Sequence, residues 1–349
     1  MSRRLLFFPF VLTVFVAAAL AAYAGRTTSA NSPADPSARS FEFMYQVHFP
    51  ASADAGGPAH LWIPLPQADG YQDVRSLHID STVAYTQGRD QEYADTFAVF
   101  APTAQQTSAG FDVTVRFAAT RREHKVPLND ASLKDASASA SPDPLMQRYL
   151  EPDKLVPLGG TIAELAKEHT AGDTTPIEKA RHIYEYVVAT MRYDKSGEGW
   201  GRGDAIWACT SKRGNCTDFH SLFIGMMRSS GIPARFEIGF PLPEGKTEGD
   251  IAGYHCWAEF YLHGVGWVPV DASEAWKNPS KHDYFFGAHD VNRVFFTYGR
   301  DIRLSADQKG DPLNYFIYPY AERNGQAVKN LQTHFSFRDI AAAQQAASR

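Results

Sequence analysis

Cysteine is scarce in this sequence. The 349 residues include only Cys209, Cys216 and Cys256. Because the number is odd, at least one thiol stays unpaired within a single chain. The spacing contains no Cys-x-x-Cys pair and matches no zinc-binding signature, which argues against a zinc finger. The free thiol is therefore the first feature that needs an explanation.

The sequence also has fewer positively than negatively charged residues. The chain has 34 Lys and Arg against 39 Asp and Glu, a net charge of −5, and it has no basic patch. Such a chain has no electrostatic reason to bind a phosphate backbone, so nucleic acid is not an expected partner. Apolar residues make up 44% of the sequence and charged residues 21%, which indicates a globular protein. The length leaves room for about two domains.

Long apolar runs are absent beyond the N-terminus. Residues 5–20 form one such run, behind Arg3 and Arg4, and Ala22-Tyr23-Ala24 then supplies the small-x-small pattern at which signal peptidases cut. We therefore predict a signal peptide over residues 1–24 and an exported mature protein, periplasmic or secreted. The alternative is an uncleaved N-terminal anchor. After the signal, no stretch approaches the roughly 18 apolar residues that a membrane span needs.

Changes in composition divide the rest of the chain. Residues 25–40 are rich in Ser, Ala, Pro and Thr and are predicted to be a flexible lead. Short alternating apolar runs from 41 to 126, separated by Gly and Pro breaks, predict a β-sandwich-like domain. The low-complexity stretch ASASASPDP predicts a linker at 127–144. Helical periodicity followed by strands then predicts an α+β domain over 145–338, before a tail at 339–349.

One cysteine falls at the predicted start of a helix. Asn215 is a favourable N-cap, and the apolar stripe after it predicts a helix that ends before Gly231. Cys216 would then lie in the first turn, where unpaired N–H groups and the helix dipole stabilise a thiolate. This position favours a reactive cysteine. The alternative, an ordinary small core residue, is left open by position alone.

Two later strands carry a histidine and an aspartate. Alternation along residues 254–262 puts His255 on one face and Cys256 on the other, which is wholly apolar. Cys256 is therefore predicted to be buried in the core and dispensable for chemistry. Asp271 ends the returning strand, sixteen residues after His255. The two share a face if the hairpin register is symmetric about a residue, which needs an odd-length loop or a bulge around Val265.

With that register, one reaction would use three side chains in different roles: Cys216, His255 and Asp271. The thiolate would attack an acyl carbon, the imidazole would exchange the proton, and the carboxylate would orient the imidazole. An aspartate after the apolar run Trp-Val-Pro-Val is costly to bury without such a partner. The alternative is that Asp271 merely caps the end of the strand in solvent.

Three sequence blocks in this order resemble the transglutaminase-like superfamily, and the resemblance covers roughly residues 160–275. The blocks are Gly214-Asn215-Cys216-Thr217-Asp218, Tyr254-His255-Cys256-Trp257-Ala258-Glu259 and Gly266-Trp267-Val268-Pro269-Val270-Asp271. The resemblance implies a papain-like α+β core, with the helix that carries the cysteine packed on an antiparallel sheet. It implies acyl transfer through a thioester, with Cys216 as nucleophile, His255 as base and Asp271 as orienting acid. The sequence departs from a common family pattern in placing Cys, not a small residue, directly after the histidine.

The expected function is that of an exported thiol-dependent enzyme acting on amide bonds of peptides or proteins. We favour a hydrolase, a peptidase or amidase, because no calcium motif and no amine-docking surface is evident. One alternative is a protein-glutamine transamidase that cross-links its substrates, and another is a catalytically idle scaffold. A third is a metal site formed by Cys209, Cys216, His220 and His255, although their spacing matches no known signature. We predict no cofactor and no metal.

Two details of the site stay open at this point. The backbone N–H of Cys216 is a natural oxyanion donor, while Trp200 and Trp207 are candidates for a second donor by residue type alone. Cys209 lies seven residues before Cys216 and could form a disulfide that silences the nucleophile. The favoured interpretation of Cys209 is a small buried residue.

Overall fold

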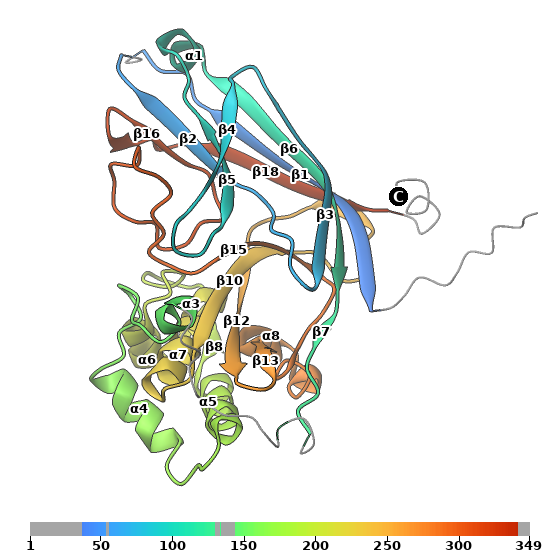
Figure 1. Cartoon of the computed structure of the whole chain (residues 1–349), viewed down its shortest axis with the longest axis vertical. Helices are drawn as coiled ribbons and strands as arrows, with labels where there is room; N and C mark the ends of the chain where they lie inside the picture. Colours follow the sequence, from blue (N-terminus) through green and yellow to red (C-terminus); the bar gives the residue numbers. More distant parts are fainter. Residues whose placement is uncertain (1–36, 54–55, 130–132, 134–143, 341–349) are drawn as a thin grey trace, which may run out of the picture. The chain divides into compact units, whose positions relative to one another are not determined.

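The computed structural model describes residues 37–53, 56–129, 133 and 144–340. The predicted signal peptide (1–24), most of the predicted lead (25–40) and linker (127–144), and residues 341–349 of the predicted tail lie outside the described residues. The three larger sheets are antiparallel and are combined with helices in one α+β fold, as the sequence predicted (Figure 1). Among the described residues, no helix is both long and apolar enough to cross a membrane.

Two five-stranded sheets form a sandwich-like layer pair. The first has the order β11-β18-β1-β6-β3 and the second the order β17-β16-β2-β5-β4. Alternation along β1 turns Phe41, Phe43 and Tyr45 inward, so the sheets share an aromatic core. The elements are β1 (Ala38–Phe49), β2 (Ala59–Pro64), β3 (Gln72–Ser81), β4 (Tyr85–Arg89), β5 (Thr96–Phe100), α1 (Ala104–Ala109), β6 (Phe111–Arg122), β11 (Glu248–Asp250), β16 (Tyr320–Arg323), β17 (Gln326–Ala327) and β18 (Gln332–Asp339).

The strands of this layer pair come from both ends of the described chain, which differs from the predicted domain boundaries. Residues 320–338 belong to the predicted second domain and residue 339 to the predicted tail, but β16 pairs with β2, and β18 pairs with β1 along eight residues. Aromatic rings of the two predicted domains also contact each other: the ring centroid of Phe43 lies 5.4 Å from that of Phe240 and 5.8 Å from that of Phe296. Sequence periodicity carries no information on which distant strands pair, so it could not reveal this return of the chain.

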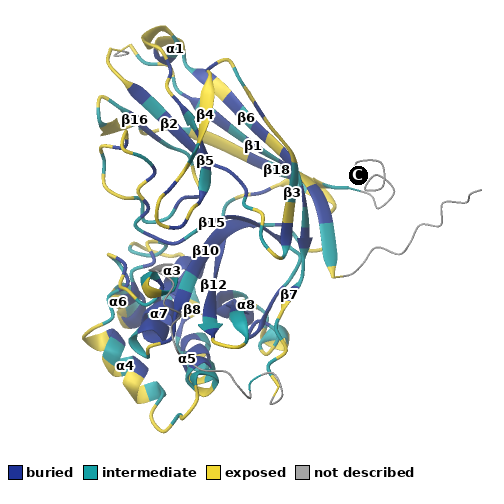
Figure 2. Cartoon of the chain, in the orientation of Figure 1, coloured by how far each residue is buried: buried dark blue, intermediate teal, exposed yellow. Residues whose placement is uncertain are grey.

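The catalytic candidates lie in a four-stranded sheet with the order β13-β12-β10-β15 and in the helices around it (Figure 1). Helix α7 is buried on all sides and contacts β12 and β10 (Figure 2). The elements are α3 (Pro144–Arg148), α4 (Thr161–His169), α5 (Pro176–Thr190), β8 (Arg192–Tyr193), α6 (Ala205–Ser211), β9 (Arg213–Gly214), α7 (Cys216–Ser229), β10 (Ala234–Pro241), β12 (His255–Leu262), β13 (Gly266–Val270), α8 (Ala272–Lys277), a 3-10 turn (Pro279–Lys281), β14 (Ala288–His289) and β15 (Arg293–Tyr298). Strand β7 (His124–Lys125) pairs with β14.

Candidate active site

Cys216 is the first residue of α7, as the N-cap pattern predicted. The Asn215 side-chain oxygen accepts the N–H of Thr217 at 3.0 Å, and the Asp218 carboxylate accepts the N–H of Asn215 at 2.9 Å. These two bonds form a capping box and fix where the helix begins. The Cys216 N–H has no carbonyl one turn earlier in the helix to receive it, so it stands at the positive end of the helix dipole.

The β12–β13 hairpin brings His255 and Asp271 to the same face. Tyr261 pairs with Trp267 and Leu262 with Gly266, so the register is symmetric about Gly264 and the loop has three residues. This confirms the predicted odd-length loop, although its centre lies one residue before Val265. Gly264 has φ of +84°, a left-handed conformation that favours glycine. The His255 Nε2 atom lies 2.7 Å from Asp271 Oδ2.

Asp271 is fully buried and has more partners than the sequence suggested. Its Oδ1 atom accepts the N–H of Glu274 at 3.0 Å and so caps α8, while Oδ2 accepts Arg293 Nη1 at 3.2 Å as well as bonding to His255. Asp271 therefore caps the helix α8 from the interior of the protein, whereas the alternative placed it in solvent at the end of the strand. Burial raises its pKa, but His255 and Arg293 outweigh burial and hold the pKa well below its usual range.

The Cys216 and His255 side chains shift each other's pKa, and both are nearly inaccessible, with 1% and 6% of their surface exposed. Because His255 Nε2 is bound to Asp271, Nδ1 is the ring nitrogen left for the thiol. Burial raises the pKa of Cys216, but hydrogen bonds from Cys256 and His255 lower it well below the ordinary thiol value. Burial lowers the pKa of His255, yet Asp271 raises it to about 10. The site thus favours a thiolate beside an imidazolium.

Comparison with known sequences matches these residues to a family. A family model described as the transglutaminase-like superfamily matches residues 163–272, which include Cys216, His255 and Asp271. An uncharacterized protein of Haemophilus influenzae is 30% identical over 331 residues, spanning 83% of this chain and 87% of that protein. The chain belongs to the transglutaminase-like superfamily. The uncharacterized protein YebA of Bacillus subtilis is 32% identical over 150 residues, 38% of this chain and 20% of that protein.

A solved structure shows the same fold. A candidate cysteine protease from Cytophaga hutchinsonii superimposes with a TM-score of 0.59 at 15% identity, covering 87% of this chain and 91% of that chain. The papain-like α+β arrangement that the sequence blocks implied is therefore confirmed.

The structure places two further residues beside the three candidates: Cys256, which strand parity assigned to the apolar face, and His220 of α7. Cys256 is fully buried, as predicted, but its thiol also lowers the pKa of Cys216. Its sulfur also lies 3.7 Å from Nδ1 of His220, a residue of α7 that is itself fully buried. His220 Nε2 lies 3.6 Å from Asp271 Oδ1. Parity along one strand cannot show this cluster, because α7 packs over the face to which Cys256 points.

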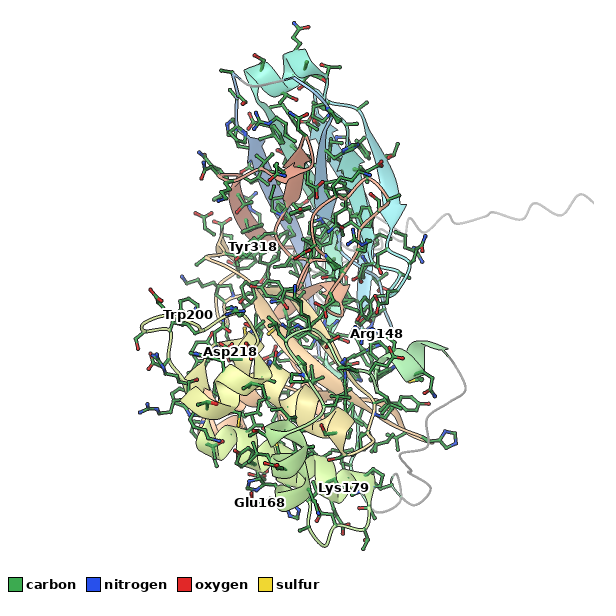
Figure 3. All side chains as sticks on the ribbon, turned by 90° about the vertical axis from the view of Figure 1, so that its left-hand side faces the viewer. Arg148, Glu168, Lys179, Trp200, Asp218 and Tyr318 are labelled. Carbon is green, nitrogen blue, oxygen red and sulfur yellow. The ribbon has the colours of Figure 1, made fainter. Side chains whose placement is uncertain are left out.

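Asp218, labelled in Figure 3, positions the loop that precedes α6. Its two carboxylate oxygens accept the N–H groups of Gly201 at 2.7 Å and Gly203 at 3.0 Å, in addition to that of Asn215. Arg300 braces the same loop by donating to the Gly203 carbonyl at 2.7 Å. Burial raises the pKa of Asp218 to about 6, although three N–H groups face it. The Asn215-x-x-Asp218 spacing of a capping box was the sequence signal for this residue.

The remaining sequence candidates are placed as follows. The Trp200 indole N–H donates to the Gly197 carbonyl at 3.1 Å, so it is occupied within its own loop. Cys209 is buried in α6, and all three cysteines are free thiols. In the part of the chain that the structure describes, Cys209, Cys216, His220 and His255 do not converge as a ligand set for a metal.

Proposed function

We propose that this chain is a cysteine-dependent acyl-transfer enzyme that hydrolyses amide bonds of peptides or proteins. The observation that carries the proposal is the chain of contacts from the Cys216 thiol to His255 and from His255 Nε2 to Asp271 Oδ2 at 2.7 Å. Each group is buried, and each has the pKa direction that its role requires. Membership of the transglutaminase-like superfamily supports the same assignment.

The first half of the proposed reaction makes a thioester. The Cys216 thiolate adds to the carbonyl carbon, and the backbone N–H of Cys216 at the start of α7 stabilises the oxyanion that forms. The His255 imidazolium then gives its proton to the departing amine as the carbon–nitrogen bond breaks. Throughout, Asp271 accepts the Nε2–H of His255, so that Nδ1 keeps facing the sulfur.

The second half consumes a water molecule. Neutral His255 takes a proton from water, whose oxygen attacks the thioester and releases the carboxylic acid. The Cys216 sulfur leaves as thiolate, and the imidazolium is restored. A transamidase would use the same acyl-enzyme with an amine in place of water, so the two activities differ in the acceptor and not in the triad.

A single assay separates these functions. We would incubate the mature protein with glutamine-containing peptides, with and without a labelled primary amine, and analyse the products by mass spectrometry. We expect cleaved or deamidated peptide without label, and no product with Cys216→Ser. The matched control is Cys209→Ser, because Cys209 is also a buried free thiol but lies outside the triad. Label in the peptide would instead establish the transamidase.

We further propose that the enzyme acts outside the cytoplasm, on peptides or proteins of the cell envelope. The support is the predicted signal peptide over residues 1–24, with Arg3, Arg4 and the Ala22-Tyr23-Ala24 cleavage pattern. Cell fractionation followed by N-terminal sequencing tests this location. A mature protein that starts at Gly25 is the expected result, and an intact N-terminus in the cytoplasm would contradict it.

A further inference from the structure

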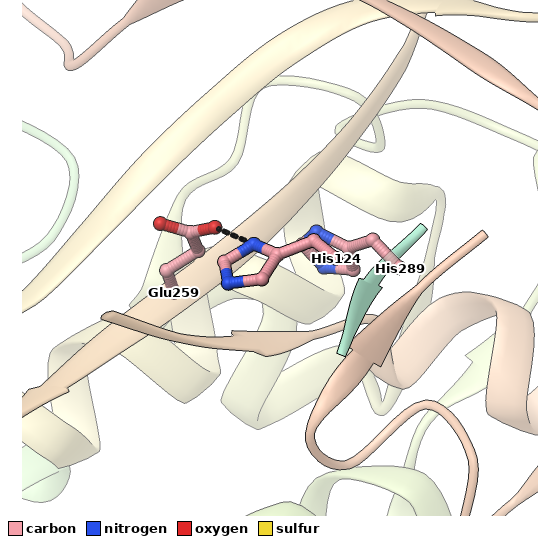
Figure 4. Close-up of side chains that lie close together, drawn as sticks. All are labelled: His124, Glu259 and His289. Atoms are coloured by element: carbon pink, nitrogen blue, oxygen red, sulfur yellow. Dashed lines mark ion pairs between the residues drawn. The ribbon is translucent and has the colours of Figure 1, made fainter. Parts of the chain in front are cut away.

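Three side chains with metal-binding atoms meet in the interior, outside the Cys216 site. His124 comes from β7, His289 from β14 and Glu259 from β12 (Figure 4). The register of the β7–β14 pair puts His124 directly opposite His289. One potential ligand atom from each of the three residues lies within 4.8 Å of the others. Their exposed fractions are 3%, 0% and 2% for His124, His289 and Glu259.

His289 has no explanation as an ordinary core residue. Both of its ring nitrogens are buried and have no hydrogen-bond partner among the described residues. A buried polar atom without a partner costs about 1–3 kcal/mol, so a phenylalanine would fill the same space with less penalty. Trp257 and His124 pack against the ring with centroids at 5.8 and 6.2 Å, which accounts for its shape but not for its nitrogens.

We propose that His124, Glu259 and His289 bind a zinc ion that ties β7 and β14 to the central sheet. Two imidazoles and one carboxylate are a donor set that zinc takes in proteins, at about 2.0–2.2 Å per bond. In tetrahedral geometry such bonds separate the ligand atoms by about 3.4 Å. His124 Nδ1 and Glu259 Oε1 already lie 3.0 Å apart, so small side-chain movements complete the site.

The surroundings leave the ligand atoms available. Arg235 Nε donates to Glu259 Oε2 at 3.0 Å, which orients the carboxylate and leaves Oε1 toward His124. Neither ring nitrogen of His289 has a hydrogen-bond partner among the described residues, so a lone pair of that ring is free to bind a metal.

The proposed ion would have a structural role. Strands β7 and β14 have two residues each, and an isolated pair of this size has little stability of its own. The segment before β14 bonds to β13 and to Asp271, which follows β13: the Gly287 N–H donates to the Pro269 carbonyl at 2.8 Å, and the Asp271 N–H donates to the Phe285 carbonyl at 3.0 Å. A zinc ion at His289 would therefore fix the segment that hydrogen-bonds to Asp271, and it would not contact the reacting atoms.

The test is metal content, measured on mature protein prepared without chelator and without a histidine tag. Mass spectrometry of the metal should find about one zinc per chain in the wild type and almost none in His289→Phe, which keeps the packing but removes the ligand. The matched control is His48→Ala, because His48 is exposed and pairs with Asp112 on the surface. Zinc should be retained in that control.

X-ray absorption on the zinc-bound wild type covers the case in which the His289 variant does not fold. We expect nitrogen and oxygen neighbours at about 2.0–2.1 Å, with no sulfur at about 2.3 Å. Wild-type protein that neither contains zinc nor takes it up would overturn the proposal. So would zinc that remains in His289→Phe, or a sulfur neighbour, which would place the ion at the cysteine cluster.

Discussion

The Asp271→Asn substitution tests the electrostatics of the site most directly. The amide has almost the shape of the carboxylate, and its oxygen can still accept the Nε2–H of His255. The negative charge is lost, and an NH₂ group replaces one carboxylate oxygen. If that group takes the place of Oδ1, it faces the N–H of Glu274, so the cap of α8 is lost as well. A lost N-cap costs about 0.5–2 kcal/mol of stability, so the variant should fold.

The size of the effect on catalysis follows from the His255–Asp271 pair. Asp271 stabilises the imidazolium and so raises the pKa of His255 to about 10. A hydrogen bond to a charged group contributes about 1.5–3 kcal/mol, and 1.36 kcal/mol corresponds to one pH unit. Without the charge, the His255 pKa should fall by about 1–2 pH units. If the same 1.5–3 kcal/mol is lost in the transition state, activity should drop about 10- to 100-fold at neutral pH.

The measurement is the pH dependence of Cys216 alkylation by iodoacetamide, together with kcat/KM on any peptide that the wild type cleaves. The wild-type kcat/KM should hold up to a basic limb near pH 10 and fall above it, because the imidazolium that protonates the departing amine is lost above its pKa. In Asp271→Asn the basic limb should move to lower pH. The control is Asp112→Asn, which breaks a 2.7 Å pair with His48 on the surface. An unchanged profile in Asp271→Asn would refute the reasoning.

Five further substitutions should give distinct results. Cys216→Ala should abolish turnover and leave the thermal unfolding temperature close to that of the wild type, whereas Cys209→Ser should retain activity. Cys256→Ala should move the acid limb of kcat/KM upward by up to about one pH unit, because the Cys216 thiolate loses a hydrogen-bond donor, and Cys256→Ser should restore it. Asp218→Asn should lower the free energy of unfolding by about 1–3 kcal/mol in chemical denaturation, since the amide cannot accept from three N–H groups. Full activity in Cys216→Ala, or an acid limb unmoved in Cys256→Ala, would contradict these roles.

Local sequence signals predicted the elements that carry the triad. Asn215, a favourable N-cap, marks the start of α7. This signal depends on one residue and the apolar stripe that follows it, which a single sequence shows directly. The common face of His255 and Asp271 could also be predicted, because one short loop fixes the register of a hairpin.

Contacts between distant segments could not be predicted in this way. The aromatic and apolar stretch Tyr315–Tyr318 has the composition of a strand but forms none, and its Phe316 and Ile317 are buried in irregular backbone. The apolar run reflects burial, and burial alone does not distinguish a strand from a packed loop. Likewise His124 and His289 lie 165 positions apart, and no periodicity links them. The placement of Cys256 against Cys216 depends on the packing of α7 on β12, which is a tertiary event.

The pairing of β1 with β18 affects the order in which the strands of this sheet can pair during folding. Arg39 in β1 binds Asp339 in β18, across 300 positions of sequence. As the chain is synthesised, β1 can pair with β6 early, but its other edge has no partner until residues 332–339 have emerged. Closing so long a loop is slow compared with local folding. The sheet that contains β1 is therefore completed only after residues 332–339 become available, which makes the pairing of β1 with β18 a late step in folding.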